Sequence, residues 1–149
     1  MSVNVSERNI EILVVEDSPS DVRLLQEAFR EISLEHCLNV VGNGEEALAF
    51  LKQEGIYQHA PQPDLILLDL NLPRMNGREF LAEIKESSEF RRIPVVVMTS
   101  SGAEEDIIRS YDLHANCFIT KPVDLDQFIT IIQSIKQFWL TIVKLPRGS

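Results

Sequence analysis

The stretch "PDLILLDLNLPRMNG", residues 63–77, decides the fold. Four apolar residues, Leu65 to Leu68, run up to Asp69, and the chain then passes into a turn rich in Asn, Pro and Gly. A short apolar run bounded by turn residues predicts a strand that is buried on both faces, as in a parallel sheet. Desolvating the Asp69 carboxylate is unfavourable unless another group pairs with it. The strand therefore ends either on a capped structural acid or at a site that uses the charge.

Short apolar runs alternate with helical stripes along the rest of the chain. Ser18 is predicted to cap the first helix, with Pro19 at its first helical position. Strands that alternate with helices predict an α/β domain with a five-stranded, all-parallel sheet covered on both faces. The predicted strands are residues 10–17, 36–41, 64–69, 93–101 and 116–122. The predicted helices are residues 18–32, 45–53, 78–87, 103–113 and 124–145.

Length and charge limit the class of protein. A chain of 149 residues suits one domain, expected to span residues 1–146, with the final Arg-Gly-Ser (147–149) as a linker remnant of cloning. The 23 acidic and 14 basic residues give a formal net charge of −9, which argues against nucleic acid as a partner. No apolar run approaches the roughly 18 residues of a membrane span, and no signal peptide is recognisable. We therefore expect neither a nucleic-acid nor a membrane partner.

The two cysteines indicate the compartment. Cys37 and Cys117 each lie in an apolar, strand-like run, so both thiols are expected to be buried and reduced. Reduced core thiols are typical of the cytoplasm.

Polar residues stand at the ends of several predicted strands. They are Glu16 and Asp17 after the first, Asp69 in the third, Thr99 in the fourth and Lys121 in the fifth. The carboxyl ends of parallel strands meet at one edge of a sheet, where ligands bind. Three adjacent carboxylates repel one another and favour a bound Mg²⁺ or Mn²⁺. With a lysine and a hydroxyl nearby, such a site suits phosphoryl transfer to Asp69.

Four motifs in this order resemble the receiver domains of two-component response regulators. They are "EDS" at 16–18, "LILLDLNLPRMNG" at 65–77, "VVVMTSS" at 95–101 and "ITKP" at 119–122. The resemblance covers nearly the whole chain and implies a doubly wound, flavodoxin-like fold. It also implies a response regulator that accepts phosphate from a sensor histidine kinase and is not an enzyme in the usual sense. Few residues follow Lys121, so we expect a stand-alone regulator without a DNA-binding output domain.

The same resemblance implies roles for individual residues. Asp69 would be the phosphoacceptor. Glu16, Asp17, Asp69 and the backbone carbonyl of Asn71 would hold the Mg²⁺.

Three further residues would serve the transfer and the switch. Lys121 would contact the phosphate, Thr99 would be the switch hydroxyl and Phe118 the switch aromatic. Movement of Thr99 and Phe118 would alter the face formed by strands 4 and 5 and the helices that follow them. The acyl phosphate would later hydrolyse by a self-catalysed reaction.

The chain is similar, more narrowly, to the small regulators that partner cyanobacterial phytochromes. The likeness lies in "DLNLPRMNGREFLAEIK" (69–85) and the proline-bearing loop before the third strand. That loop, residues 54–63, is long for an α/β connection and is the main departure from a minimal receiver. The resemblance implies a phytochrome as the kinase and light as the signal.

The last predicted helix carries more apolar residues than one packing stripe needs. Ile131, Phe138, Leu140 and Leu145 lie off the stripe that should pack on the sheet. They indicate either a broader core contact or a seam that is buried against a second copy. We expect a homodimer.

Two other functions are compatible with the sequence. The first is a receiver-like interaction module that no longer turns over phosphate. The second is a nucleotide-binding enzyme, because "GNGEEA" (42–47) matches a dinucleotide fingerprint. Glu45 and Glu46 would repel a pyrophosphate there, which makes the nucleotide reading weak.

Overall fold

The structure is a computed structural model of the whole chain. It describes residues 9–32, 35–72, 75–99, 117–120 and 124–144. For residues 99, 117–120, 135 and 138–144 only the backbone is described.

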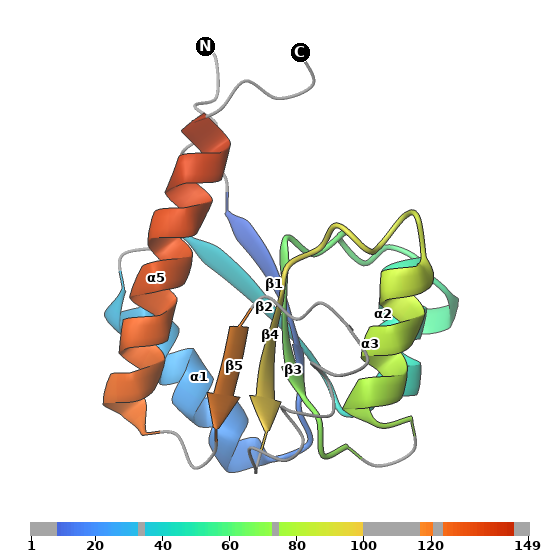
Figure 1. Cartoon of the computed structure of the whole chain (residues 1–149), viewed down its shortest axis with the longest axis horizontal. Coiled ribbons are helices and arrows are strands. Elements are labelled where there is room, and N and C mark those ends of the chain that lie inside the picture. Colours follow the sequence, from blue (N-terminus) through green and yellow to red (C-terminus); the bar gives the residue numbers. More distant parts are fainter. Residues whose placement is uncertain (1–8, 33–34, 73–74, 100–116, 121–123, 145–149) are drawn as a thin grey trace.

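A five-stranded parallel sheet forms the centre of the molecule (Figure 1). Its strands are β1 (Ile10–Val15), β2 (His36–Val41), β3 (Leu65–Asp69), β4 (Val95–Thr99) and β5 (Cys117–Thr120). The strand order is β2-β1-β3-β4-β5, so the chain reverses direction across the sheet after β2 and places β1 and β3 side by side. The five strands and their parallel arrangement confirm the sequence prediction. Each predicted strand end lies within two residues of the observed one, because turn residues flank each core segment.

Helices cover both faces of this sheet. Helices α1 (Pro19–Glu31) and α5 (Leu125–Lys144) lie on one face, and α2 (Gly44–Lys52) and α3 (Gly77–Glu86) lie on the other (Figure 1). This two-sided cover is the doubly wound, flavodoxin-like arrangement. The helix predicted at residues 103–113 lies outside the described residues.

Side-chain caps fix where three of the helices begin. Ser18 accepts a hydrogen bond from the Asp21 amide and caps α1, as predicted, with Pro19 at the first helical position. Asn43 caps α2 by accepting from the Glu46 amide. At α3, Asn76 and Glu79 form a reciprocal capping box.

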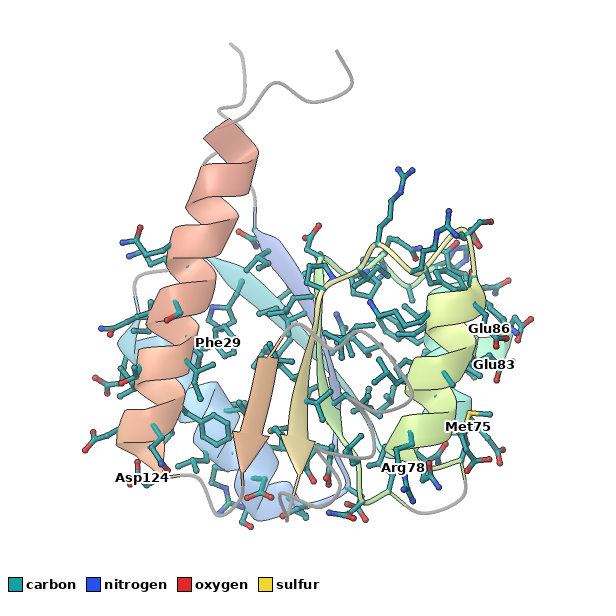
Figure 2. All side chains as sticks on the ribbon, viewed as in Figure 1. Phe29, Met75, Arg78, Glu83, Glu86 and Asp124 are labelled. Carbon is teal, nitrogen blue, oxygen red and sulfur yellow. The ribbon has the colours of Figure 1, made fainter. Side chains whose placement is uncertain are left out.

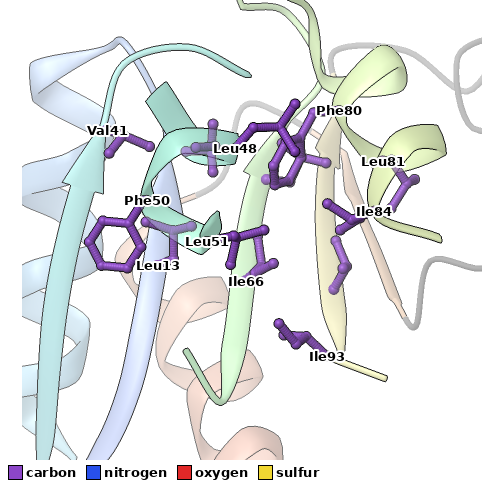
Figure 3. Close-up of a cluster of buried hydrophobic side chains, with 14 of the residues drawn as sticks. Leu13, Val41, Leu48, Phe50, Leu51, Ile66, Phe80, Leu81, Ile84 and Ile93 are labelled. Atoms are coloured by element: carbon purple, nitrogen blue, oxygen red, sulfur yellow. The ribbon is translucent and has the colours of Figure 1, made fainter. Parts of the chain in front are cut away.

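The apolar side chains form one core on each face of the sheet. Figure 3 shows the core beneath α2 and α3, where alternate residues of β1 and β3 meet the helices. The opposite core lies beneath α1 and α5 and includes Phe29, Phe128 and Ile132. Because successive residues of a strand point to opposite faces, both cores draw on the same continuous apolar runs.

Strand β2 is less buried than the sequence predicted. It lies at the edge of the sheet, and five of its six residues, His36 to Val40, are half-buried or exposed. The Cys37 thiol is consequently half-buried rather than a core residue, which corrects the prediction for that cysteine. The side chain of Cys117 lies outside the described residues.

The loop at residues 54–63 is folded back against α2. It contains a short 3₁₀-helix, η2 (Gly55–Tyr57), where the sequence predicted only a polar loop. The Tyr57 ring packs against Phe50, with ring centroids 5.4 Å apart, and its hydroxyl donates to Glu46 Oε1 at 3.2 Å. These contacts fasten the loop to the helix that precedes it.

Helix α5 spans 20 residues, close to the predicted 22, and its C-terminal end, red in Figure 1, extends past the sheet. Ile131, expected to lie off the packing stripe, is half-buried against the core beneath α1 and α5. It therefore contributes to a broader core contact. The side chains of Phe138 and Leu140, and the whole of Leu145, lie outside the described residues. No helix in the described part of the chain is long and apolar enough to cross a membrane.

Candidate functional site

Three carboxylates converge at the carboxyl ends of β1 and β3. The parallel register pairs Val15 with Leu68, so the residues that follow each strand start side by side. Glu16, Asp17 and Asp69 each offer a carboxylate oxygen, and these oxygens all lie within 4.8 Å of one another. The sequence predicted this convergence from strand ends that are 52 residues apart in the chain.

Backbone amides orient two of these carboxylates. The Ser18 amide donates to Glu16 Oε1 at 3.2 Å, in the same turn in which the Ser18 side chain caps α1. The Asn71 amide donates to Asp69 Oδ1 at 3.0 Å. The site is therefore positioned by the turns that follow the strands as well as by the strands themselves.

The environment of the three carboxylates favours a bound cation. Glu16 and Asp69 are each 2% exposed, whereas Asp17 is exposed and faces solvent. Charged groups so close together and so poorly hydrated repel one another unless a cation compensates them. Three hard carboxylate oxygens with one side open to water suit Mg²⁺ or Mn²⁺, which retain several water ligands. The donor set fits the predicted ion.

Backbone placement brings Thr99 to the same edge of the sheet. Met98 pairs with Asp69, and Thr99, the last residue of β4, lies one position farther along. Thr99 in turn pairs with Thr120, the last residue of β5, and Phe118 pairs with Val97. Lys121, the predicted phosphate contact, follows Thr120 and lies outside the described residues.

Gly77 is a site residue that the sequence reading did not identify. A Cβ atom at this position would lie 2.6 Å from the backbone carbonyl oxygen of Asp69 and 2.6 Å from Cα of Leu70. The Gly77 amide also donates to the Leu70 carbonyl at 3.2 Å. Only glycine permits this close packing of the start of α3 against the end of β3. The Asn-Gly pair at 76–77 signalled a turn, but it did not reveal what the turn packs against.

The "GNGEEA" segment forms the start of α2, and the Glu46 side chain accepts hydrogen bonds from two donors of this segment. Glu46 Oε2 accepts from the Asn43 side chain at 3.1 Å and from the Gly42 amide at 3.4 Å. Donors at a helix N-terminus are what a nucleotide phosphate binds. Their use by Glu46 disfavours the nucleotide-enzyme alternative.

Comparison with protein families finds one match over most of the chain. The family model described as "Response regulator receiver domain" matches residues 12–133. That segment contains Glu16, Asp17 and Asp69 and extends into α5.

Individual relatives show the same likeness. Response regulator Rcp1 from Synechocystis sp. is 50% identical over 135 residues, covering 91% of this chain and 92% of that protein. The crystal structure of the phosphorylated cyanobacterial phytochrome response regulator RcpA matches with a TM-score of 0.79 at 50% identity, covering 91% of this chain and 96% of that one. The structure of the Mn²⁺-bound form of Rcp1 matches with a TM-score of 0.78 at 50% identity, covering 92% and 99% of the two chains.

Proposed function

The chain belongs to the response regulator receiver domain family of two-component signalling, and from that membership we propose that Asp69 is its phosphoacceptor. Receiver domains work with histidine kinases and are not enzymes in the usual sense. The observation that carries the assignment of Asp69 is its position: a buried carboxylate whose oxygen lies within 4.8 Å of those of Glu16 and Asp17.

The reaction follows from the chemistry of a carboxylate nucleophile. An oxygen of Asp69 attacks the phosphorus of a phosphohistidine, a P–O bond forms, and the P–N bond breaks with its electron pair passing to the imidazole nitrogen, which is protonated. The Asn71 amide holds the Asp69 carboxylate through Oδ1 while this occurs. A divalent cation bound at the site supplies positive charge that offsets the phosphoryl oxygens.

The remaining ligands and contacts are part of the proposal. Glu16, Asp17 and Asp69 hold the cation with their side chains, and Asn71 with its backbone carbonyl. Lys121 pairs with the phosphoryl group, which is supported by its place directly after β5, the strand next to β4 in the sheet.

Phosphorylation is proposed to act through the neighbouring strands. The new charge on Asp69 draws in the hydroxyl of Thr99, and Phe118 repacks in response. The register of the strands supports this path. Asp69 pairs with Met98, which directly precedes Thr99 in β4, and β4 pairs directly with β5. The face proposed to change is that of β4, β5 and α5, together with the helix that the sequence predicts at residues 103–113. It signals by contact with another protein or by relay of the phosphate. Self-catalysed hydrolysis of the acyl phosphate returns the domain to its first state.

Intact-mass spectrometry after incubation with Mg²⁺ and acetyl phosphate tests the proposed function. The wild-type chain should gain one phosphoryl group, and Asp69→Asn should gain none. Glu83→Gln is a matched control, because Glu83 is exposed on α3 and points away from the sheet (Figure 2). A wild-type chain that gains no phosphate from acetyl phosphate or from a histidine kinase would favour the alternative, an interaction module that does not turn over phosphate.

A phytochrome is the kinase that we propose as phosphate donor. The support is the 50% identity to Rcp1 and to RcpA, which is described as a phytochrome response regulator. Transfer from an autophosphorylated cyanobacterial phytochrome should be faster than transfer from an unrelated histidine kinase at equal concentration. Equal rates with both kinases would contradict the phytochrome assignment and leave the phosphoacceptor assignment intact.

The protein is further proposed to act as a cytoplasmic homodimer. Helix α5 extends past the sheet and carries Phe138 and Leu140 in the part next to its C-terminal end, which supports a seam between two copies (Figure 1). The free thiol of Cys37 supports a reducing compartment.

A further inference from the structure

The start of α2 touches the turn that follows the phosphoacceptor strand. The Gly44 amide donates to the backbone carbonyl of Met75 at 3.0 Å. Met75 lies beside the start of α3, at the end of the sheet to which the strands point (Figure 2). The two residues are far apart in the chain, and Met75 lies in the segment between Asp69 and the start of α3.

This contact leaves no space for a side chain at position 44. A Cβ atom there would lie 2.6 Å from the Met75 carbonyl oxygen, 2.8 Å from its Cγ and 3.0 Å from its Cβ. Cβ atoms do not approach a backbone oxygen this closely, so either the turn or the helix would have to move.

The helix side of the contact is firmly anchored. Asn43, which is 6% exposed, caps α2, and its side-chain amide donates to Glu46. Glu46 also accepts from the Gly42 amide and from the Tyr57 hydroxyl, which ties α2 to the loop at 54–63. Because these bonds hold α2 in place, a bulkier residue at position 44 would displace the turn.

The turn side of the contact leads directly to Asp69. Met75 precedes Asn76, the cap of α3, and Gly77, where an added Cβ atom would lie 2.6 Å from the Asp69 carbonyl oxygen. The amide of Asn71, in the same turn, donates to the Asp69 carboxylate. A shift of Met75 is therefore transmitted to the groups that orient the phosphoacceptor.

We propose that Gly44 is a positioning residue for phosphoryl transfer, which sets the turn after β3 through its close contact with Met75. The inference rests on the proposed function of Asp69. It assigns a role in the reaction to the "GNG" segment, which contributes no side chain to the carboxylate site.

Gly44→Ala tests the proposal, with Gly42→Ala as a matched control. A Cβ atom at Gly42 would lie 3.6 Å from Glu46 Oε2, an ordinary van der Waals contact, and neither glycine has a left-handed backbone conformation. The rate of phosphorylation by acetyl phosphate at saturating Mg²⁺ is measured per folded molecule, below the unfolding temperature. Gly44→Ala should lower this rate at least about threefold, whereas Gly42→Ala should leave it unchanged.

A double-variant cycle separates positioning from simple destabilisation. Met75→Gly removes two of the three Met75 atoms that a Cβ atom at position 44 would meet. It also gives the backbone at position 75 more freedom to move the third, the carbonyl oxygen. Gly44→Ala should therefore reduce the rate less in that background than in the wild type. If Gly44→Ala is too unstable to assay, Glu46→Gln is measured instead. This substitution alters the hydrogen bonds by which Glu46 holds α2 in place, and it should also slow phosphorylation.

Two outcomes would overturn the inference. One is a Gly44→Ala variant with a lowered unfolding temperature and a wild-type rate per folded molecule. The other is an equal loss of rate with and without the Met75 side chain. A wild-type protein that accepts no phosphate would instead show that the proposed function itself is wrong.

Discussion

At the scale of single residues, the site depends on a charge that the strand alone could not hold. Asp69 ends a strand whose other four residues are all buried, and it is itself 2% exposed. The Asn71 amide satisfies part of its hydrogen-bonding capacity, and the nearby Glu16 and Asp17 carboxylates favour a bound cation. The carboxylate that is costly as a structural feature is therefore well suited to bind a cation and accept a phosphoryl group.

Asp17→Asn should weaken binding of Mn²⁺ by about tenfold or more, because it removes one of three clustered carboxylate charges. Isothermal titration with MnCl₂ measures the change. Asp21→Asn is the control, since Asp21 lies in the first turn of α1 and is not one of the three clustered acids. An equal loss of Mn²⁺ affinity in the two variants would mean that Mn²⁺ binding depends on the overall charge of the protein rather than on this site.

The titration of Tyr57 makes the stability depend on pH in the alkaline range. Burial raises the pKa of Tyr57 above its ordinary value of 10.0, and the neighbouring Glu46 carboxylate raises it further. Above pH 10 the unfolded chain releases this proton while the folded chain retains it, so the contribution to stability is complete below pH 10 and is lost as the pH rises through the folded pKa.

Urea unfolding between pH 9 and about pH 11 should therefore show a steeper fall of stability in the wild type than in Tyr57→Phe. Burial lowers the pKa of Lys85, which acts in the opposite direction, but this group is present in both proteins and cancels in the comparison. Parallel curves for the two proteins would contradict a raised pKa of Tyr57 in the folded protein.

At the scale of elements, the start of a helix could be predicted from the sequence, but the contacts between elements could not. Ser18 and Pro19 predicted the start of α1, because capping uses residues that are adjacent in the chain. The fold-back of residues 54–63 onto α2 was not predicted, since the contact of Tyr57 with Phe50 and Glu46 depends on three-dimensional proximity. The half-buried state of Cys37 was also missed, because an apolar run does not reveal whether its strand lies at the edge of a sheet.

Loss of the α3 cap should destabilise the fold without removing the carboxylate site. Asn76→Ala should lower the free energy of unfolding by about 1 kcal/mol, because the Glu79 amide loses its acceptor. Asn76→Ser, which retains a capping oxygen, should recover most of that loss. Urea denaturation of the two variants and the wild type measures both effects. Equal stability of Asn76→Ala and Asn76→Ser would show that the capping oxygen does not stabilise the fold.

At the scale of the whole molecule, the order of the strands determines which side chains meet at the candidate site. The sequence placed Glu16, Asp17 and Asp69 at strand ends, and the order β2-β1-β3-β4-β5 brings them together. This convergence was predictable because parallel strands share one carboxyl edge. The extent of the core contact of α5 was not, since Ile131 lies off the main stripe yet packs against the core beneath α1 and α5.

The proposed homodimer predicts a defined response to charge on α5. Phe138→Glu should convert a dimer into a monomer at micromolar concentration, because a carboxylate in an apolar seam is poorly hydrated. Sedimentation equilibrium measures the mass, and Gln137→Glu is the control, since Gln137 is exposed on the same helix. A wild-type protein that is monomeric both with and without phosphorylation would contradict the proposed homodimer.

Chemical location of the phosphate tests most directly whether Asp69 is the phosphoacceptor. The protein is treated with acetyl phosphate in Mg²⁺ or in EDTA, then reduced with borohydride, which converts an aspartyl phosphate to homoserine, and digested for peptide sequencing by mass spectrometry. If Asp69 accepts phosphate with a bound divalent cation, homoserine is expected at residue 69 in the Mg²⁺ sample and aspartate in the EDTA sample. Homoserine at another acidic residue, or its formation at residue 69 without a divalent cation, would contradict a site in which Asp69 accepts phosphate beside Glu16 and Asp17 with a bound ion.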